Sequence, residues 1–151
     1  MLYNGVMSAK LSSNHTAMLL DHNYESAIRI RSLLSEMDIR LVEWSTSGIN
    51  WLPKWQSLKP SITFVDLMLP HKDGFHCIKQ IRETDGTHFP IFLHSYMGAQ
   101  ASYCELRALD LGVSSVLQKP FTDARFKLTV ERYFENQVKI TSVKKVSLPG
   151  L

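Results

Sequence analysis

The sequence has few of the features that mark secreted, membrane-spanning or zinc-binding proteins. Only two of its 151 residues are cysteines, Cys77 and Cys104, and they lack C-x-x-C spacing, so we expect free core thiols rather than a disulfide or metal site. No apolar run approaches the ~18 residues of a membrane span. The first residues contain no basic segment followed by an apolar run, which argues against a secretory signal. We therefore expect a cytoplasmic protein without a membrane partner.

Strong charge and metal-type histidine spacing are also missing. The net charge is +3, and the basic residues are scattered except near Lys139, Lys144 and Lys145. This pattern indicates a solvated tail rather than a nucleic-acid interface. The six histidines show neither H-x-x-x-H nor H-E-x-x-H spacing, so we interpret most as surface residues. His94, beside a candidate site residue, is expected to point to the opposite face.

Short apolar runs alternate with amphipathic segments along the chain. The strands predicted from these runs are 16–20, 39–44, 62–65, 90–95 and 115–119. The helices predicted from apolar spacings of three and four are 24–37, 51–58, 75–85, 101–111 and 122–137. Such alternation predicts an α/β fold, with a five-stranded parallel sheet and helices on both faces. We expect an N-terminal extension (1–14), one domain (15–137) and a C-terminal tail or linker (138–151).

Four of the predicted strands are followed by, or end in, a residue able to do chemistry. These residues are Asp21, Asp66, Ser95 and Lys119. One common doubly wound solution is the flavodoxin-like strand order 2-1-3-4-5, in which the ends of the first and third strands lie side by side. Because ligands bind at that edge of an open α/β sheet, we expect the four side chains to share one crevice.

The loop after the third strand carries the most specific motif. Its residues, Asp66 to Gly74, read D-L-M-L-P-H-K-D-G. This pattern resembles the phosphoacceptor loop of response-regulator receiver domains, which share the CheY-like form of this fold. Several motifs in the same order extend the resemblance over residues 16 to 137.

The resemblance implies a role for each strand-end residue. Asp66 is the expected phosphoacceptor, Lys119 the cation that pairs with it, and Ser95 the hydroxyl that donates to a phosphoryl oxygen. A bound Mg²⁺ or Mn²⁺ is expected on Asp21, Asp66 and the backbone carbonyl of Met68. The family also implies a cis peptide bond between Lys119 and the proline that follows it.

Two positions depart from the family pattern. His22 stands where the family usually has a second acid that contacts the metal. Its imidazole is a candidate ligand better suited to manganese or zinc, so we expect weakened magnesium binding. Val116 replaces an aromatic residue that often moves with the serine or threonine, and a weaker or altered switch is expected.

Three functions remain open from the sequence. The first is a two-component receiver that is not a conventional enzyme, is phosphorylated by a sensor histidine kinase or phosphotransfer protein, and signals to an unknown protein without binding nucleic acid. The second is an atypical receiver that works as a phosphorylation-independent interaction module. The third is a flavin- or nucleotide-binding protein, which is disfavoured because the loop from Asp21 to Glu25 would repel a phosphate that is not accompanied by a metal ion. Homodimerisation through the last two helices and the fifth strand stays open.

Overall fold

A central parallel sheet organises the protein. The structure is a computed structural model and describes residues 14–85 and 90–147, so most of the predicted N-terminal extension and the end of the tail lie outside it. Five strands pair in the order β2-β1-β3-β4-β5, and every pairing is parallel. This confirms the predicted fold class. The strands are β1 (Thr16–Leu20), β2 (Arg40–Ser45), β3 (Ile62–Asp66), β4 (Ile91–Ser95) and β5 (Ser115–Gln118).

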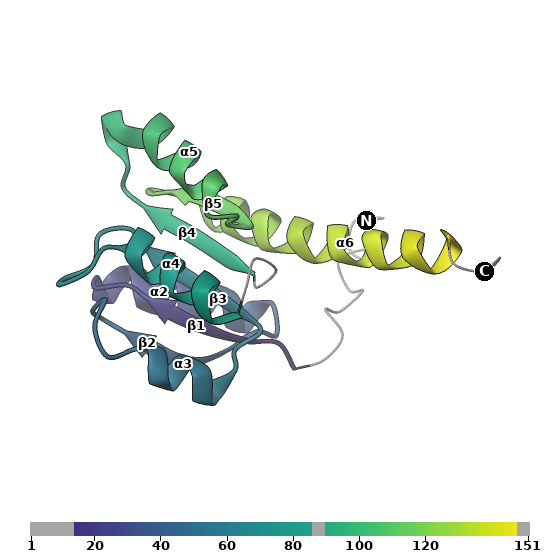
Figure 1. Ribbon diagram of the computed structural model, residues 1–151, viewed down its shortest axis with the longest axis horizontal. Coiled ribbons are helices and arrows are strands. Elements are labelled where there is room, and N and C mark those ends of the chain that lie inside the picture. Colours follow the sequence, from purple (N-terminus) through teal and green to yellow (C-terminus); the bar gives the residue numbers. More distant parts are fainter. Residues whose placement is uncertain (1–13, 86–89, 148–151) are drawn as a thin grey trace.

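Helices cover both faces of the sheet (Figure 1). Helices α2 and α6 pack on one face and α3, α4 and α5 on the other, as the two hydrophobic clusters show. A short 3-10 helix, η1 (Gly98–Gln100), precedes α5. The helices are α2 (Tyr24–Glu36), α3 (Leu52–Leu58), α4 (Gly74–Asp85), α5 (Ala101–Asp110) and α6 (Asp123–Ser147). None of the described helices is both long and apolar enough to cross a bilayer.

Burial follows from the position of each strand. Strands β3 and β4 are buried along their whole length because helices cover both of their faces, whereas β2 is only partly buried at the edge of the sheet. Aromatic packing fills the α2 and α6 side, where Phe64 stacks on Phe126 at 5.5 Å and meets Phe92 edge-on at 5.1 Å. These rings anchor α6 to the middle of the two central strands.

The two tryptophans at the start and in the middle of α3 pack in the core. Trp51 and Trp55 are buried, and the Trp55 indole donates to the Thr63 hydroxyl at 2.9 Å. Leu58, the last residue of α3, is 43% exposed. Cys77 and Cys104 are buried free thiols, as predicted, and burial raises the pKa of Cys77 to about 11.

Helix α6 is longer than the sequence suggested. It was predicted to end near residue 137, but it continues to Ser147. The reason is that no proline or glycine occurs in this segment before Pro149, so the local sequence contains no helix breaker. The later part of α6 projects away from the rest of the domain (Figure 1).

Gly74 allows α4 to begin directly beside the end of β3. Its amide donates to the carbonyl of Leu67 at 2.9 Å. A Cβ atom at this position would collide with the carbonyl oxygen of Asp66 and lie 2.8 Å from the Cα of Leu67. A side chain here must therefore displace the backbone that carries Asp66.

We expect Gly74→Ala to lower the free energy of unfolding by about 1 to 3 kcal/mol, because backbone atoms must move to admit the methyl group. Urea unfolding of the variant and the parent measures this difference. Glu83→Ala, an exposed substitution in the same helix, is the control and should stay within about 0.5 kcal/mol of the parent. Equal stability of Gly74→Ala and the control would contradict the collision.

Candidate functional site

The carboxyl ends of four parallel strands form the candidate site. Asp21 follows β1, Asp66 ends β3, Ser95 ends β4 and Lys119 follows β5. All four residues are buried, and Asp66 is only 3% exposed. The structure thus brings together the four strand-end residues that the sequence singled out.

Lys119 links the two carboxylates. Its ammonium nitrogen lies 2.9 Å from Oδ2 of Asp21 and 2.9 Å from Oδ2 of Asp66. Two buried carboxylates repel each other unless a cation lies between them, and the ammonium group supplies that charge. The peptide bond between Lys119 and Pro120 is cis, as the family resemblance implied.

The second carboxylate oxygen of Asp66 also accepts hydrogen bonds. Its Oδ1 atom accepts hydrogen bonds from the Ser95 hydroxyl and from the Met68 amide, both at 2.9 Å. Three donors from three segments therefore fix the orientation of the Asp66 carboxylate. The Met68 side chain itself points outward and is exposed.

Asp21 is held by donors that the sequence did not reveal. The Ser26 hydroxyl donates to its Oδ2 atom at 2.7 Å, and the Asn23 amide donates to Oδ1 at 2.8 Å. The Trp44 indole donates to its backbone carbonyl at 2.7 Å. Burial by itself raises the pKa of Asp21, but hydrogen bonds from His94, Ser26 and Asn23 hold that pKa well below its usual range.

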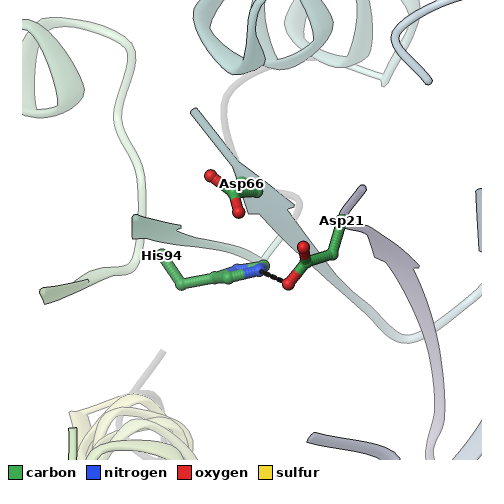
Figure 2. Close-up of side chains that lie close together, drawn as sticks. All are labelled: Asp21, Asp66 and His94. Carbon is green, nitrogen blue, oxygen red and sulfur yellow. Dashed lines mark hydrogen bonds and ion pairs between the residues drawn. The ribbon is translucent and has the colours of Figure 1, made fainter. Parts of the chain in front are cut away.

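His94 corrects one sequence interpretation. It was expected to point away from the site, yet its Nε2 atom lies 3.1 Å from Oδ2 of Asp21 (Figure 2). The register explains this placement, because His94 pairs with Asp66 across β3 and β4, and paired residues of neighbouring strands lie on the same face. Predicting that Asp66 pairs with His94 would have placed the His94 side chain at the site.

The part of the site around the Asp21 and Asp66 carboxylates, called the acidic pocket below, contains one group of possible metal ligands among the described residues. Asp21, Asp66 and His94 each offer a ligand atom, and these atoms lie within 4.8 Å of one another. The candidate His22 is exposed and is not part of this group. The two carboxylates fit a hard cation such as Mg²⁺, which prefers oxygen ligands. His94 fits less well, because its Nδ1 atom is buried without a hydrogen-bond partner.

The surroundings of Ser95 also differ from the family pattern. Val116 lies half-buried in β5, paired with Leu93. Tyr96 is 66% exposed and its ring lies 5.8 Å from the Lys119 ammonium. The Tyr96 ring therefore lies beside the site, but Tyr96 directly follows β4, whereas the family's aromatic residue lies on β5.

A family comparison agrees with this geometry. The model of the response regulator receiver domain matches residues 17–131. The chain belongs to the response regulator receiver family. Receiver domains work in two-component signalling, interact with histidine kinases or phosphotransfer proteins, bind Mg²⁺ in an acidic pocket and are generally not catalytic enzymes.

Individual relatives support the same assignment. The chemotaxis protein CheY of Thermotoga maritima is 26% identical over 108 residues, which cover 72% of this chain and 88% of that protein. A protein-glutamate methylesterase/protein-glutamine glutaminase of a Nocardioides species is 30% identical over 101 residues, covering 64% of this chain and 27% of that protein. The chain spans only about a quarter to a third of the length of such methylesterase relatives and matches their receiver part.

Solved structures show the same fold. A two-component response regulator from Clostridium difficile superposes with a TM-score of 0.71 at 22% identity, covering 82% of this chain and 98% of that one. The non-phosphorylated HemR receiver domain from Leptospira biflexa gives a TM-score of 0.70 at 21% identity, covering 80% and 94%. These likenesses concern the fold.

We expect Lys119→Met to lower the free energy of unfolding by about 3 kcal/mol, because it leaves two buried carboxylates without their common cation. In an Asp66→Asn background the same substitution should cost at least about 1 kcal/mol less, since one negative charge is already gone. Urea unfolding of the parent, both single variants and the double variant measures this coupling. Strictly additive losses would contradict a shared ammonium bridge.

Proposed function

We propose that the protein is a phosphoryl-accepting receiver and that Asp66 is its acceptor. The observation that supports this most is the pair of contacts on Asp66, with the Lys119 ammonium on Oδ2 and the Ser95 hydroxyl on Oδ1. A carboxylate so placed has a cation and a hydroxyl donor ready for the oxygens of an incoming phosphoryl group. The proposed receiver unit is residues 15–137.

In the proposed reaction, one carboxylate oxygen of Asp66 attacks the phosphorus atom of a donor. A bond forms between phosphorus and that oxygen, and the bond from phosphorus to the leaving group of the donor breaks with its electron pair. Lys119 neutralises charge on the transferred group, while Ser95 donates to one of its oxygens. A divalent cation, when bound by Asp21 and Asp66, supplies further positive charge there.

The donor is proposed to be a sensor histidine kinase or a phosphotransfer protein, as for the family. The output is proposed to be contact with a downstream protein, and residues 138–151 are proposed to serve as a docking extension or a linker. Homodimerisation through α5, β5 and α6 is a further possibility for that output, and the oligomeric state before and after phosphorylation tests it.

A second function has its own supporting observation. Asp66 is 3% exposed, and each of its oxygens already accepts a hydrogen bond from the protein. A site that is closed and internally satisfied also suits a receiver that signals by protein contact without phosphorylation. The two functions differ in whether Asp66 reacts.

The deciding experiment is intact mass spectrometry after incubation with acetyl phosphate and either Mg²⁺ or Mn²⁺. We expect the parent to gain the mass of one phosphoryl group, because Asp66 and its supports form a complete acceptor site. Asp66→Asn should gain none, since an amide does not form the acyl phosphate.

Asp73→Asn is the matched control, because Asp73 lies in the same loop and its carboxylate caps α4 through the His76 amide at 2.9 Å. That variant should still accept the phosphoryl group. An adduct of equal yield on Asp66→Asn, or no adduct on the parent with either cation, would argue against phosphorylation of Asp66. The second outcome would favour the phosphorylation-independent module.

A further inference from the structure

His94 is an unusual buried polar residue in the middle of the acidic pocket. Its side chain is fully buried, its ring lies 6.5 Å from that of Phe64, and its Nε2 atom contacts Asp21 at 3.1 Å (Figure 2). Its other ring nitrogen, Nδ1, has no hydrogen-bond partner among the described residues. Burying Nδ1 without a partner costs free energy. The hydrogen bond between Nε2 and Asp21 is the polar contact of the ring that can offset this cost.

The direction of this hydrogen bond follows from the other contacts of Asp21. Its carboxylate accepts from the Ser26 hydroxyl, the Lys119 ammonium and the Asn23 amide. An ammonium group and a backbone amide can only donate, so the Asp21 carboxylate acts as an acceptor toward them. His94 therefore donates its Nε2 proton, and Oδ2 of Asp21 receives three donors.

This arrangement differs from that of a metal-ligating histidine. Such a residue binds the ion through a bare ring nitrogen and almost always donates its other N–H to a carboxylate, carbonyl or water. If Nε2 of His94 were bare, the proton of a neutral ring would have to be on Nδ1, which has no acceptor among the described residues. The surroundings thus favour a donor to Asp21 over a ligand.

We propose that His94 is an internal hydrogen-bond donor that competes with a divalent cation for Asp21, and so lowers the affinity of the acidic pocket for Mg²⁺ and Mn²⁺. Oδ2 of Asp21 is the atom that Lys119 links to Asp66, so a cation held by the two carboxylates would compete there with the His94 proton. The N–H dipole also lowers the negative potential of the whole carboxylate, so binding through Oδ1 is weakened as well.

The consequence concerns regulation of the proposed receiver, and it rests on the proposed function only for the location of the cation. With His94 in place, the cation-free form of the site is stabilised by its own side chains. The cation concentration needed to fill the pocket rises accordingly. His94, rather than the exposed His22, is then the residue that sets the cation requirement.

The test measures cation binding without any phosphoryl donor. Mn²⁺ is titrated into the parent, His94→Leu and His94→Gln, and the free ion is quantified by electron paramagnetic resonance; Mg²⁺ affinity follows from competition. We expect His94→Leu to bind both cations about 10-fold more tightly than the parent, because one charge-assisted hydrogen bond to Asp21 is gone. His94→Gln, whose amide can still donate, should stay close to the parent.

Controls separate this effect from misfolding and from failure of the proposed function. Circular dichroism checks each variant, and His94→Met, with a flexible side chain that fills irregular space, replaces His94→Leu if the latter does not fold. Asp21→Asn should abolish the tighter binding. Equal or weaker cation binding by His94→Leu would overturn the proposal, and weaker binding would make the imidazole a ligand. Because no phosphoryl transfer is measured, either result is independent of whether Asp66 reacts.

Discussion

The ammonium group of Lys119 is the interaction on which the site depends. It lies 2.9 Å from a carboxylate oxygen of Asp21 and 2.9 Å from one of Asp66, with all three side chains almost inaccessible to solvent. Two carboxylates removed from water are strongly unfavourable without such a cation, since their repulsion is poorly screened. The carboxyl ends of β1, β3 and β5 must therefore lie close together, and the parallel sheet in the order β2-β1-β3-β4-β5 places all of them at the same edge.

Most of this could be predicted from the sequence because its signals are local. An apolar run that ends in Asp21, Asp66 or Lys119 is visible in a few residues, and parallel topology then gathers the strand ends. The position of His94 could not be predicted in this way, since it depends on the pairing of Asp66 with His94 between strands that lie far apart in the sequence.

Two other differences have equally specific causes. Ser26 donates to Asp21 from the first turn of α2, and an isolated serine at a helix start does not by itself predict such a contact. The end of α6 was placed too early because the composition of residues 138–147 suggested a tail. The helix continues through them because they contain neither proline nor glycine. Sequence reasoning thus located the strands, and the ends of every described α-helix except α6, to within about a residue.

The donors on Asp21 also explain how the site could tolerate a change of charge at Asp66. A phosphoryl group on Asp66 would draw Lys119 toward its oxygens, because an ammonium group prefers the greater negative charge. Asp21 would then lose one donor but keep those from Ser26 and His94, so its buried carboxylate would not be left unpaired. In a pocket where a cation usually supplies that compensation, His94 performs part of it from within the protein. The imidazole that weakens cation binding is, by the same hydrogen bond, the group that makes the site less dependent on a cation.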